Sequence, residues 1–340
     1  MKLAKVISLI IKDRVYVGAT LIMRRRSINI PKWIKAKSAK RMLQKTKIFE
    51  INKAVKPLFI ETPDGMNQLV HPDVIRTEEG RYLMVVSPYP FGYEVFENPV
   101  FYESDNFEKW EYISGPIDFP EVSKGGRRHF SDPVIAKEGE YICFYRECRY
   151  DIDVPVTTIY LQKSNNLKSW GNKKIVFSSP MSECDVISPS IYFDDIGMHF
   201  YCCAMIQNEM KLIKVDGYDI ARDKFIEMNL KGIPKQKILW HMSVIPHNKG
   251  ELFLIVLADC FGGANSELYI AVHRDYEDDT VRIVKKIRIK EIVDNITIEY
   301  RATGVVEENT LKIIASVMYD DKTWGCVYLE EKNVENLFEQ

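Results

Sequence analysis

The sequence predicts an all-β fold, a five-bladed β-propeller preceded by a short basic, partly helical N-terminal extension. One observation is a phrase of two short apolar runs, joined by a charged or glycine-containing turn, that occurs five times. The phrases begin near positions 71, 132, 188, 241 and 301, which lie 61, 56, 53 and 60 residues apart. Strand pairs that repeat at about this period are typical of propeller blades. The other observation is a turn that recurs at the same period.

The five phrases define the first two strands of each predicted blade. In chain order they are His71–Ile75 with Tyr82–Val86, Ser131–Ile135 with Tyr141–Tyr145, Ser188–Tyr192 with Met198–Tyr201, Trp240–Ile245 with Leu252–Val256, and Arg301–Val306 with Leu311–Ala315. Third strands are expected at Ile159–Lys163, Lys211–Val215, Leu268–His273 and Gly325–Leu329. The β-branched and aromatic residues in these runs favour strands.

The recurring turn has the pattern Ser-x-Asn-x-x-x-Trp. It occurs at Ser104–Trp110 and again at Ser164–Trp170, with the two serines 60 residues apart. Because this offset matches the blade period, the turn supports a true internal repeat rather than a chance of composition. We expect each tryptophan to pack between neighbouring sheets.

Residues 1–48 form the predicted N-terminal extension, and residues 49–340 form the predicted propeller. From Met1 to Lys47 the extension has fourteen Lys and Arg residues and a single acid, Asp13. Its apolar stretch, Leu3–Ile11, is too short to span a bilayer. A basic segment that lies on an anionic membrane surface explains this composition. A solvated helix or tail is the alternative.

The remaining composition favours a cytoplasmic protein, peripheral at the inner membrane face through residues 1–48. Secretion stays open as the alternative. The net charge is −1, so the whole chain has no general attraction for nucleic acid. The seven cysteines form no C-x-x-C pair, and most lie within apolar runs. This pattern indicates a reducing compartment, with neither a disulfide framework nor a zinc site.

The first residues of the five phrases are candidates for a functional site. They are His71, Asp132, Ser188, His241 and Arg301. The first strand of each propeller blade lines the central channel, so these side chains should converge at the channel mouth. Ionisable groups that lead apolar strands need polar partners, and a shared channel supplies them.

Long inserts between the predicted strands add further candidates, because loops on a rigid scaffold carry binding residues. The inserts are expected at Tyr89–Pro99, Gly115–Phe130, Arg146–Pro155 and Asp259–Ser266. The predicted substrate-binding residues are His71, Tyr89, Arg146, Glu147, Asp185, Ser188, Trp240, His241 and Arg301. Carboxylates, cations and aromatic rings in one channel suit a carbohydrate. The arginines favour an anionic one, since their planar fork matches a carboxylate.

Asp132 is the central catalytic candidate, because it leads a blade strand. Glycoside hydrolysis needs two carboxyl groups, one protonated and one ionised. Glu97 and Asp73 are the candidate partners of Asp132, and Glu147 and Asp185 compete with them. An arginine nearby would keep Asp132 ionised.

Other chemistries find little support. The sequence has no phosphate-binding loop, no H-E-x-x-H, no G-x-S-x-G and no G-x-G-x-x-G. We predict no cofactor and no metal site, because the six histidines are scattered, although His71 and His241 could meet across the channel. An ion at the channel centre is the alternative.

The blade phrases resemble the five-bladed propellers of the furanosidase superfamily, which includes glycoside hydrolase family 43. Val70–Ile75 resembles a W-A-P-D-V blade start, Ser131–Pro133 a D-P start whose aspartate orients substrate, and His241–Ser243 a G-H-x-S blade. Ser87–Pro90 and Glu97–Pro99 resemble a glycosidase-like branch from bacteria and phages. The resemblance covers about residues 67 to 330.

This resemblance implies a glycoside hydrolase that acts on a bacterial poly- or oligosaccharide. One position departs from the pattern: the family's general acid is a glutamate in an E-G-P phrase, and here the matching phrase is Ile187–Pro189. The catalytic pair would then have moved, for instance to Glu97 with Asp132. The alternative is a propeller that binds glycans or assists polysaccharide assembly without hydrolysis.

Overall fold

The computed structural model describes residues 32–48, 54–118, 128–150, 152–274 and 278–340, and most of them lie in β-strands. The first 31 residues of the basic extension are outside the described ranges. The strands are β1 (Val55–Leu58), β2 (Leu69–Arg76), β3 (Tyr82–Pro88), β4 (Val100–Ser104), β5 (Glu111–Ser114), β6 (Arg128–Glu138), β7 (Glu140–Arg149), β8 (Val156–Ser164), β9 (Lys174–Pro180), β10 (Cys184–Asp194), β11 (Gly197–Ile206), β12 (Glu209–Asp216), β13 (Ile226–Lys231), β14 (Ile238–His247), β15 (Gly250–Ala258), β16 (Glu267–Arg274), β17 (Thr280–Ile287), β18 (Ile296–Glu307), β19 (Thr310–Tyr319) and β20 (Trp324–Lys332).

Helices are few among the described residues. They are α2 (Lys32–Ile48), α3 (Ile289–Ile292) and the short 3-10 helices η2 (Pro90–Gly92), η3 (Glu94–Phe96), η4 (Arg222–Lys224) and η5 (Val334–Glu339). None of the helices in the described ranges is long and apolar enough to cross a membrane.

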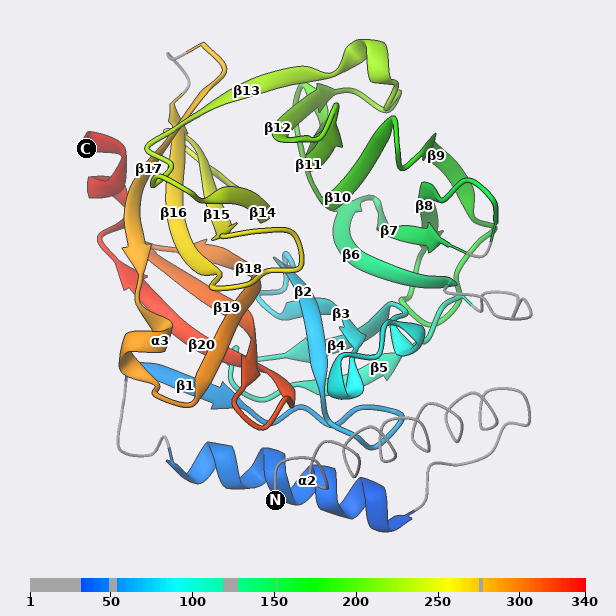
Figure 1. Ribbon diagram of the computed structural model, residues 1–340, viewed down its shortest axis with the longest axis vertical. Coiled ribbons are helices and arrows are strands. Elements are labelled where there is room, and N and C mark those ends of the chain that lie inside the picture. Colours follow the sequence, from blue (N-terminus) through cyan, green and yellow to red (C-terminus); the bar gives the residue numbers. More distant parts are fainter. Residues whose placement is uncertain (1–31, 49–53, 119–127, 151, 275–277) are drawn as a thin grey trace, which may run out of the picture.

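The strands form antiparallel sheets arranged around a central axis (Figure 1). β2–β5 and β6–β9 are two four-stranded sheets, and β10–β13 and β14–β17 are joined through the parallel pair β13–β17. The first strands contact one another in sequence, β2 with β6, β6 with β10, β10 with β14, β14 with β18, and β18 with β2. The inner strands therefore form a closed ring, which brings the starts of the repeated phrases together.

The last sheet is completed by the start of the described chain. Its order is β1-β20-β19-β18, so β1 (Val55–Leu58) pairs with β20 (Trp324–Lys332). Sequence reasoning treated residues 49–70 only as a lead-in and missed this strand. This pairing ties the last sheet to the first, because the chain runs directly from β1 into β2, the first strand of the first sheet.

A β-bulge interrupts the first strand of every sheet at the repeated phrase. The register shifts lie between Val70 and Asp73, Ser131 and Val134, Ile187 and Ser190, Leu239 and His241, and Glu299 and Ala302. His71, Asp132 and Ser188 each precede a proline and have φ values of 57°, 50° and 51°. A bulge leaves its residue outside the ladder and re-aims the side chain. Here it turns the lead residues toward the axis.

The recurring turn packs sheets together, as expected. In the first copy the Ser104 hydroxyl accepts hydrogen bonds from the backbone N–H groups of Asn106 and Phe107. The ring of Trp170, in the second copy, stacks on Phe101 of the preceding sheet at 4.7 Å between centroids. The tryptophan prediction is therefore confirmed for this copy, and all four predicted third strands lie within β8, β12, β16 and β20.

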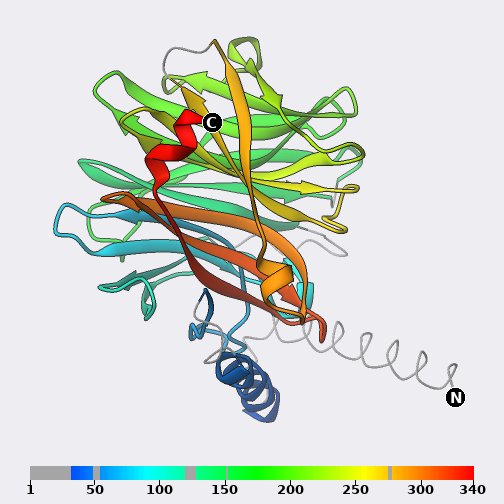
Figure 2. The ribbon, with the colours of Figure 1, turned by 90° about the vertical axis from the view of Figure 1, so that its left-hand side faces the viewer.

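Helix α2 lies at the edge of the ring beside β1 (Figures 1 and 2). It places a partly helical segment within the basic extension. The seven cysteines are free thiols, buried except for Cys260. They fit the expected absence of a disulfide framework, and the reducing compartment stays a prediction.

Candidate functional site

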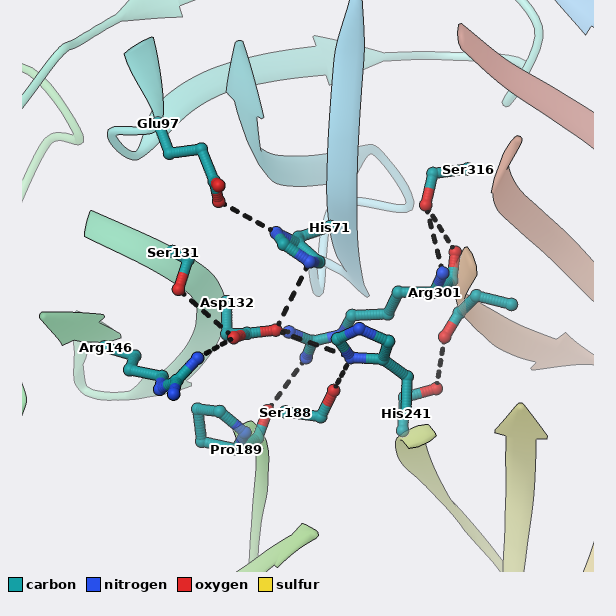
Figure 3. Close-up of polar contacts among 12 residues, drawn as sticks. His71, Glu97, Ser131, Asp132, Arg146, Ser188, Pro189, His241, Arg301 and Ser316 are labelled. Atoms are coloured by element: carbon teal, nitrogen blue, oxygen red, sulfur yellow. Dashed lines mark hydrogen bonds and ion pairs between the residues drawn. The ribbon is translucent and has the colours of Figure 1, made fainter. Parts of the chain in front are cut away.

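Asp132 lies at the centre of a buried polar cluster on the propeller axis (Figure 3). Its Oδ1 atom is 3.6 Å from His71 Nε2, 3.7 Å from His241 Nδ1 and 3.4 Å from Arg301 Nη1. These groups come from β2, β14 and β18, the inner strands of three other sheets. We call His71, Asp132, His241 and Arg301, with Glu97, the axial cluster. Its first four members are lead residues of the repeated phrases.

The other oxygen of Asp132 is held by its own sheet. Oδ2 lies 3.6 Å from Arg146 Nη1 and accepts a hydrogen bond of 3.2 Å from the Ser131 hydroxyl. Burial alone would raise the pKa of Asp132, but His71, His241, Arg301 and Arg146 together lower that pKa well below its usual range. Asp132 is therefore an ionised carboxylate at neutral pH.

The two histidines of the cluster are oriented by different partners. His71 Nδ1 lies 3.2 Å from Glu97 Oε2, which leaves Nε2 facing Asp132. His241 Nδ1 contacts the Ser188 hydroxyl, and His241 Nε2 has no hydrogen-bond partner. Burial lowers the pKa of His241 well below its usual value, so this imidazole is neutral. His71 therefore lies between two carboxylates, and His241 keeps one nitrogen without a hydrogen-bond partner.

Arg301 is fully buried and fixed from two sides. Its Nη2 donates to the carbonyl of Pro189 at 2.8 Å, while Nη1 faces Asp132. The bulge at Arg301 breaks the strand ladder, and the Ser316 side chain replaces the missing partner: its hydroxyl accepts from Arg301 N–H and donates to Arg301 C=O. The arginine is a permanent positive charge built into the axis.

Glu97 reaches the cluster from a loop and not from an inner strand. It follows helix η3 (Glu94–Phe96), and its carbonyl accepts a hydrogen bond from Phe130 N–H at the start of the second sheet. Burial raises the pKa of Glu97 to about 7, although the contact with His71 lowers it in part. At neutral pH this buried group exchanges between its acid and its ionised form.

The cluster contains a set of residues that could hold a metal ion. Ligand atoms of His71, Asp132 and His241 all lie within 4.8 Å of one another, and all three residues are buried. Two imidazoles and a carboxylate suit divalent transition metals. The contact of Glu97 with the outer nitrogen of His71 matches the carboxylate that commonly supports a metal-bound histidine. The donor set and the unpartnered Nε2 atom of His241 therefore fit such an ion.

Aromatic rings surround the cluster. Tyr300 packs against both imidazoles, with its ring centroid 5.0 Å from that of His71 and 4.4 Å from that of His241. Trp240 lies edge-on to His241 and 6.1 Å from Phe261, a half-exposed ring. Tyr89 meets the edge of Trp324 at 5.2 Å. Such rings offer apolar faces against which a sugar ring can stack.

A salt bridge lies next to the cluster. Arg146 Nη2 donates to Asp185 Oδ1 at 2.6 Å, while the Nη1 atom of the same side chain faces Asp132. The sequence placed Arg146 and Glu147 in an insert, but both lie in β7 (Glu140–Arg149), opposite Ser131 and Phe130. The predicted insert was wrong at these two positions because β7 is longer than its apolar run: its pairing with β6 continues to Arg149.

Asp73 and Glu147, two of the carboxylates that the sequence offered as partners of Asp132, bind other groups. Asp73 accepts hydrogen bonds from Ile135 N–H at 2.9 Å and from the Thr303 hydroxyl at 3.3 Å, so it joins three sheets. Glu147 is engaged by Arg128 and by the Tyr160 hydroxyl. Both carboxylates have structural partners of their own. We therefore keep Glu97, and not Asp73, as the partner of Asp132.

Sequence reasoning missed Tyr300, Ser131 and Trp324. Tyr300 directly precedes Arg301, as Trp240 precedes His241. This matched aromatic position before two lead residues is the signal that could have identified it. Ser131 and Trp324 carry no comparable signal, because serines and tryptophans also recur in the turns.

No protein-family model matches this sequence, and no curated protein matches it. Solved structures do resemble it. An N-acetylgalactosamine deacetylase from F. plautii, in complex with blood group B trisaccharide, has a TM-score of 0.67 at 16% identity, over 84% of this chain and 96% of its own. A family 43 endo-arabinanase from Bacillus licheniformis has a TM-score of 0.54 at 12% identity, over 78% and 93%.

A xylan β-1,4-xylosidase from Bacillus halodurans C-125 also matches, with a TM-score of 0.54 at 13% identity, over 78% of this chain and 53% of its own. The chain therefore has the same fold as these solved structures. The sequence identities are low. They show the fold alone, so the chemistry has to be argued from the axial cluster.

Proposed function

We propose that this chain is a hydrolase that acts on a poly- or oligosaccharide at the axial cluster. The proposal rests on one observation: His71, Asp132 and His241 gather their ligand atoms within 4.8 Å at the ring's axis. A fold shared with carbohydrate-active enzymes makes a glycan the natural substrate class. The aromatic rings of Tyr89, Trp240 and Tyr300 supply stacking surfaces for sugars.

The chemistry that best fits the cluster is removal of an acyl group from a sugar with the help of a divalent metal ion. His71, Asp132 and His241 would hold the ion, which supplies a Lewis acid and lowers the pKa of water. The N-acetylgalactosamine deacetylase from F. plautii has the same fold. The engaged oxygens of Asp132 favour a ligand role over that of a free base.

The chain's own residues have distinct tasks in this scheme. Glu97 and Ser188 orient the two imidazoles through their Nδ1 atoms. Arg301 and Arg146 keep Asp132 ionised. Glu97, which is buried beside His71, is the group placed to take and return a proton. Arg146 is less deeply buried than Arg301, and the anionic sugar remains a prediction that rests on these arginines.

Glycosidic cleavage is the second candidate, because Glu97 and Asp132 flank the same imidazole. Two carboxyl groups across a small gap are the requirement for glycoside hydrolysis. In this scheme Glu97 protonates the leaving oxygen and Asp132 stabilises positive charge on the sugar. No carboxylate occupies the position of Ser188, so the pair differs from the one that the resemblance implies.

The experiment measures metal content, released acetate and new reducing ends on a panel of acetylated and plain oligosaccharides. We expect bound divalent metal, acetate release that a chelator stops, and loss of both in Asp132→Asn. Asp194→Asn, the same change at a distant, exposed surface site paired with His199, serves as the control and should keep both.

Each of the other outcomes contradicts the deacylation scheme. Reducing ends that form in the presence of chelator and disappear in Glu97→Gln identify the glycosidase. Glycan binding without any product in every variant identifies a propeller that binds or helps to assemble polysaccharide.

A further inference from the structure

Helix α2 presents a basic face to solvent. The exposed residues of this helix are Lys32, Trp33, Ala36, Lys37, Lys40, Leu43 and Gln44. At 3.6 residues per turn they fall along one side of the helix, which we call the basic face. The whole helix, KWIKAKSAKRMLQKTKI, contains no acidic residue. The basic face therefore has no internal charge compensation.

The opposite side of α2 is fixed to the propeller. The Ser38 hydroxyl donates to the carbonyl of Met66 and accepts from Gln68 Nε2 at 3.2 Å. Met42 is buried in the hydrophobic core, and Lys45 pairs with Asp321 at 3.0 Å while lying over the ring of Tyr319. These contacts set the rotation of the helix, so the basic face points away from the propeller.

Large apolar side chains lie within the basic face. Trp33 is 70% exposed and Leu43 is 45% exposed. Lys45 has a carboxylate partner, whereas Lys37 and Lys40 have none among the described residues. Exposed tryptophan and leucine between unpaired lysines are the composition of helices that lie in the interface of an anionic bilayer.

The apolar residues also distinguish a bilayer from a polyanion. Lysines alone would suit nucleic acid or an acidic glycan equally well. An exposed leucine gains nothing from a phosphate backbone in water, but it gains from the acyl boundary of a membrane. Tryptophan has an apolar body and a polar N–H, which suit the headgroup layer.

We propose that the basic face of α2 binds the surface of an anionic lipid bilayer. Trp33 and Leu43 enter the interfacial layer, and Lys37 and Lys40 contact the lipid headgroups. Binding is peripheral, with the propeller held beside the membrane. This inference is independent of the chemistry proposed for the axial cluster.

The test is flotation of the full chain with vesicles of phosphatidylcholine, with and without about 30 mol% phosphatidylserine. We expect binding only to the anionic vesicles, and release as salt rises, because the Debye length falls to about 3 Å at 1 M. The double substitution Lys37→Glu/Lys40→Glu should lower the partition coefficient at least about tenfold. Trp33→Ala should lower it about fivefold, through loss of the apolar contact alone.

The matched control is Lys109→Glu/Lys168→Glu, the same charge change at exposed lysines of the two recurring turns. This variant should bind vesicles as the parent chain does, and circular dichroism should show that all variants are folded. Three results overturn the proposal: no vesicle binding, equal binding to both vesicle types, or binding that survives the α2 substitutions. Binding to heparin or DNA that is insensitive to Trp33→Ala would identify a polyanion site in place of the bilayer.

Discussion

Asp132 shows how a single buried charge can be held by groups far apart in the sequence. It is 1% exposed, yet it stays ionised because the positive charges of Arg301 and Arg146 face its two oxygens. The two arginines cannot lose their protons, so they are the permanent counter-charges. Arg301 contributes at zero exposure, where water cannot replace it. The contact between Asp132 and Arg301 can therefore be tested by replacing a single residue.

Replacement of Arg301 by methionine should destabilise the chain by about 3–5 kcal/mol, because it leaves the Asp132 carboxylate buried with fewer partners. Urea denaturation gives the free energy of unfolding. Arg288→Met is the control: that side chain is 67% exposed and pairs with Glu291, so its loss should change stability by less than about 1 kcal/mol. Equal effects of the two substitutions would show that Arg301 does not compensate Asp132.

The sequence could predict only those site residues whose place in the fold is set by the internal repeat. His71, Asp132, Ser188, His241 and Arg301 hold equivalent places in five phrases, and the ring brings His71, His241 and Arg301 around the Asp132 carboxylate. A repeat cannot show which other charged groups find partners elsewhere. Asp73 and Glu147 looked equivalent to Glu97 in sequence, but backbone and side chains of other segments occupy their oxygens.

At the scale of elements, neighbouring sheets are joined by polar groups as well as by apolar packing. Glu251 on β15 accepts hydrogen bonds from Tyr192 on β10 and Tyr201 on β11, at 2.8 and 2.9 Å, and contacts His273 on β16. Burial alone would raise the pKa of Glu251, but these contacts lower it to about 2. The carboxylate thus links the outer parts of two sheets.

This pKa shift predicts that the chain loses part of its stability in acid, when Glu251 becomes protonated. Because the folded pKa is lower than the ordinary value of 4.5, the stabilisation is complete above pH 4.5 and is lost as the pH falls toward 2. It amounts to about 3 kcal/mol at most. Glu251→Gln should remove this dependence, so the melting temperature of the variant should fall less than that of the parent chain between about pH 5 and 2.5.

Glu227→Gln provides the comparison, since Glu227 forms an exposed pair with Lys211 and joins no sheets. It should leave the acid profile unchanged. A Glu251→Gln profile that runs parallel to the parent's over the whole pH range would show that this carboxylate does not link stability to pH.

The strands could be predicted from the sequence where their apolar runs are long. The second strands β3 and β15 carry buried side chains at every position, which gives a strong signal. β1 has only four residues, with Lys56 and Pro57 in its centre, so no periodicity could identify it. The bulges were also invisible, because they depend on backbone conformation at His71, Asp132 and Ser188.

At the scale of the whole molecule, an early and a late segment of the described chain meet in one sheet, where β1 pairs with β20. Val55 on β1 is opposite Leu329 on β20, and both belong to one hydrophobic core with residues of β15, β16 and β19. Sequence segments some 270 positions apart therefore share one sheet. A closed ring whose inner strands contact in sequence should unfold as one unit, because opening any junction exposes the apolar side chains packed between the two sheets.

Val55→Ser should therefore lower the free energy of unfolding of the entire propeller by about 2–4 kcal/mol, through a lost apolar contact and a buried hydroxyl. Scanning calorimetry should show a single transition at a lower temperature. Lys56→Ser, on the neighbouring and more exposed position of β1, should cost less than about 1 kcal/mol. A separate low-temperature transition in Val55→Ser would mean that the last sheet opens alone, and the ring would then not be one cooperative structure.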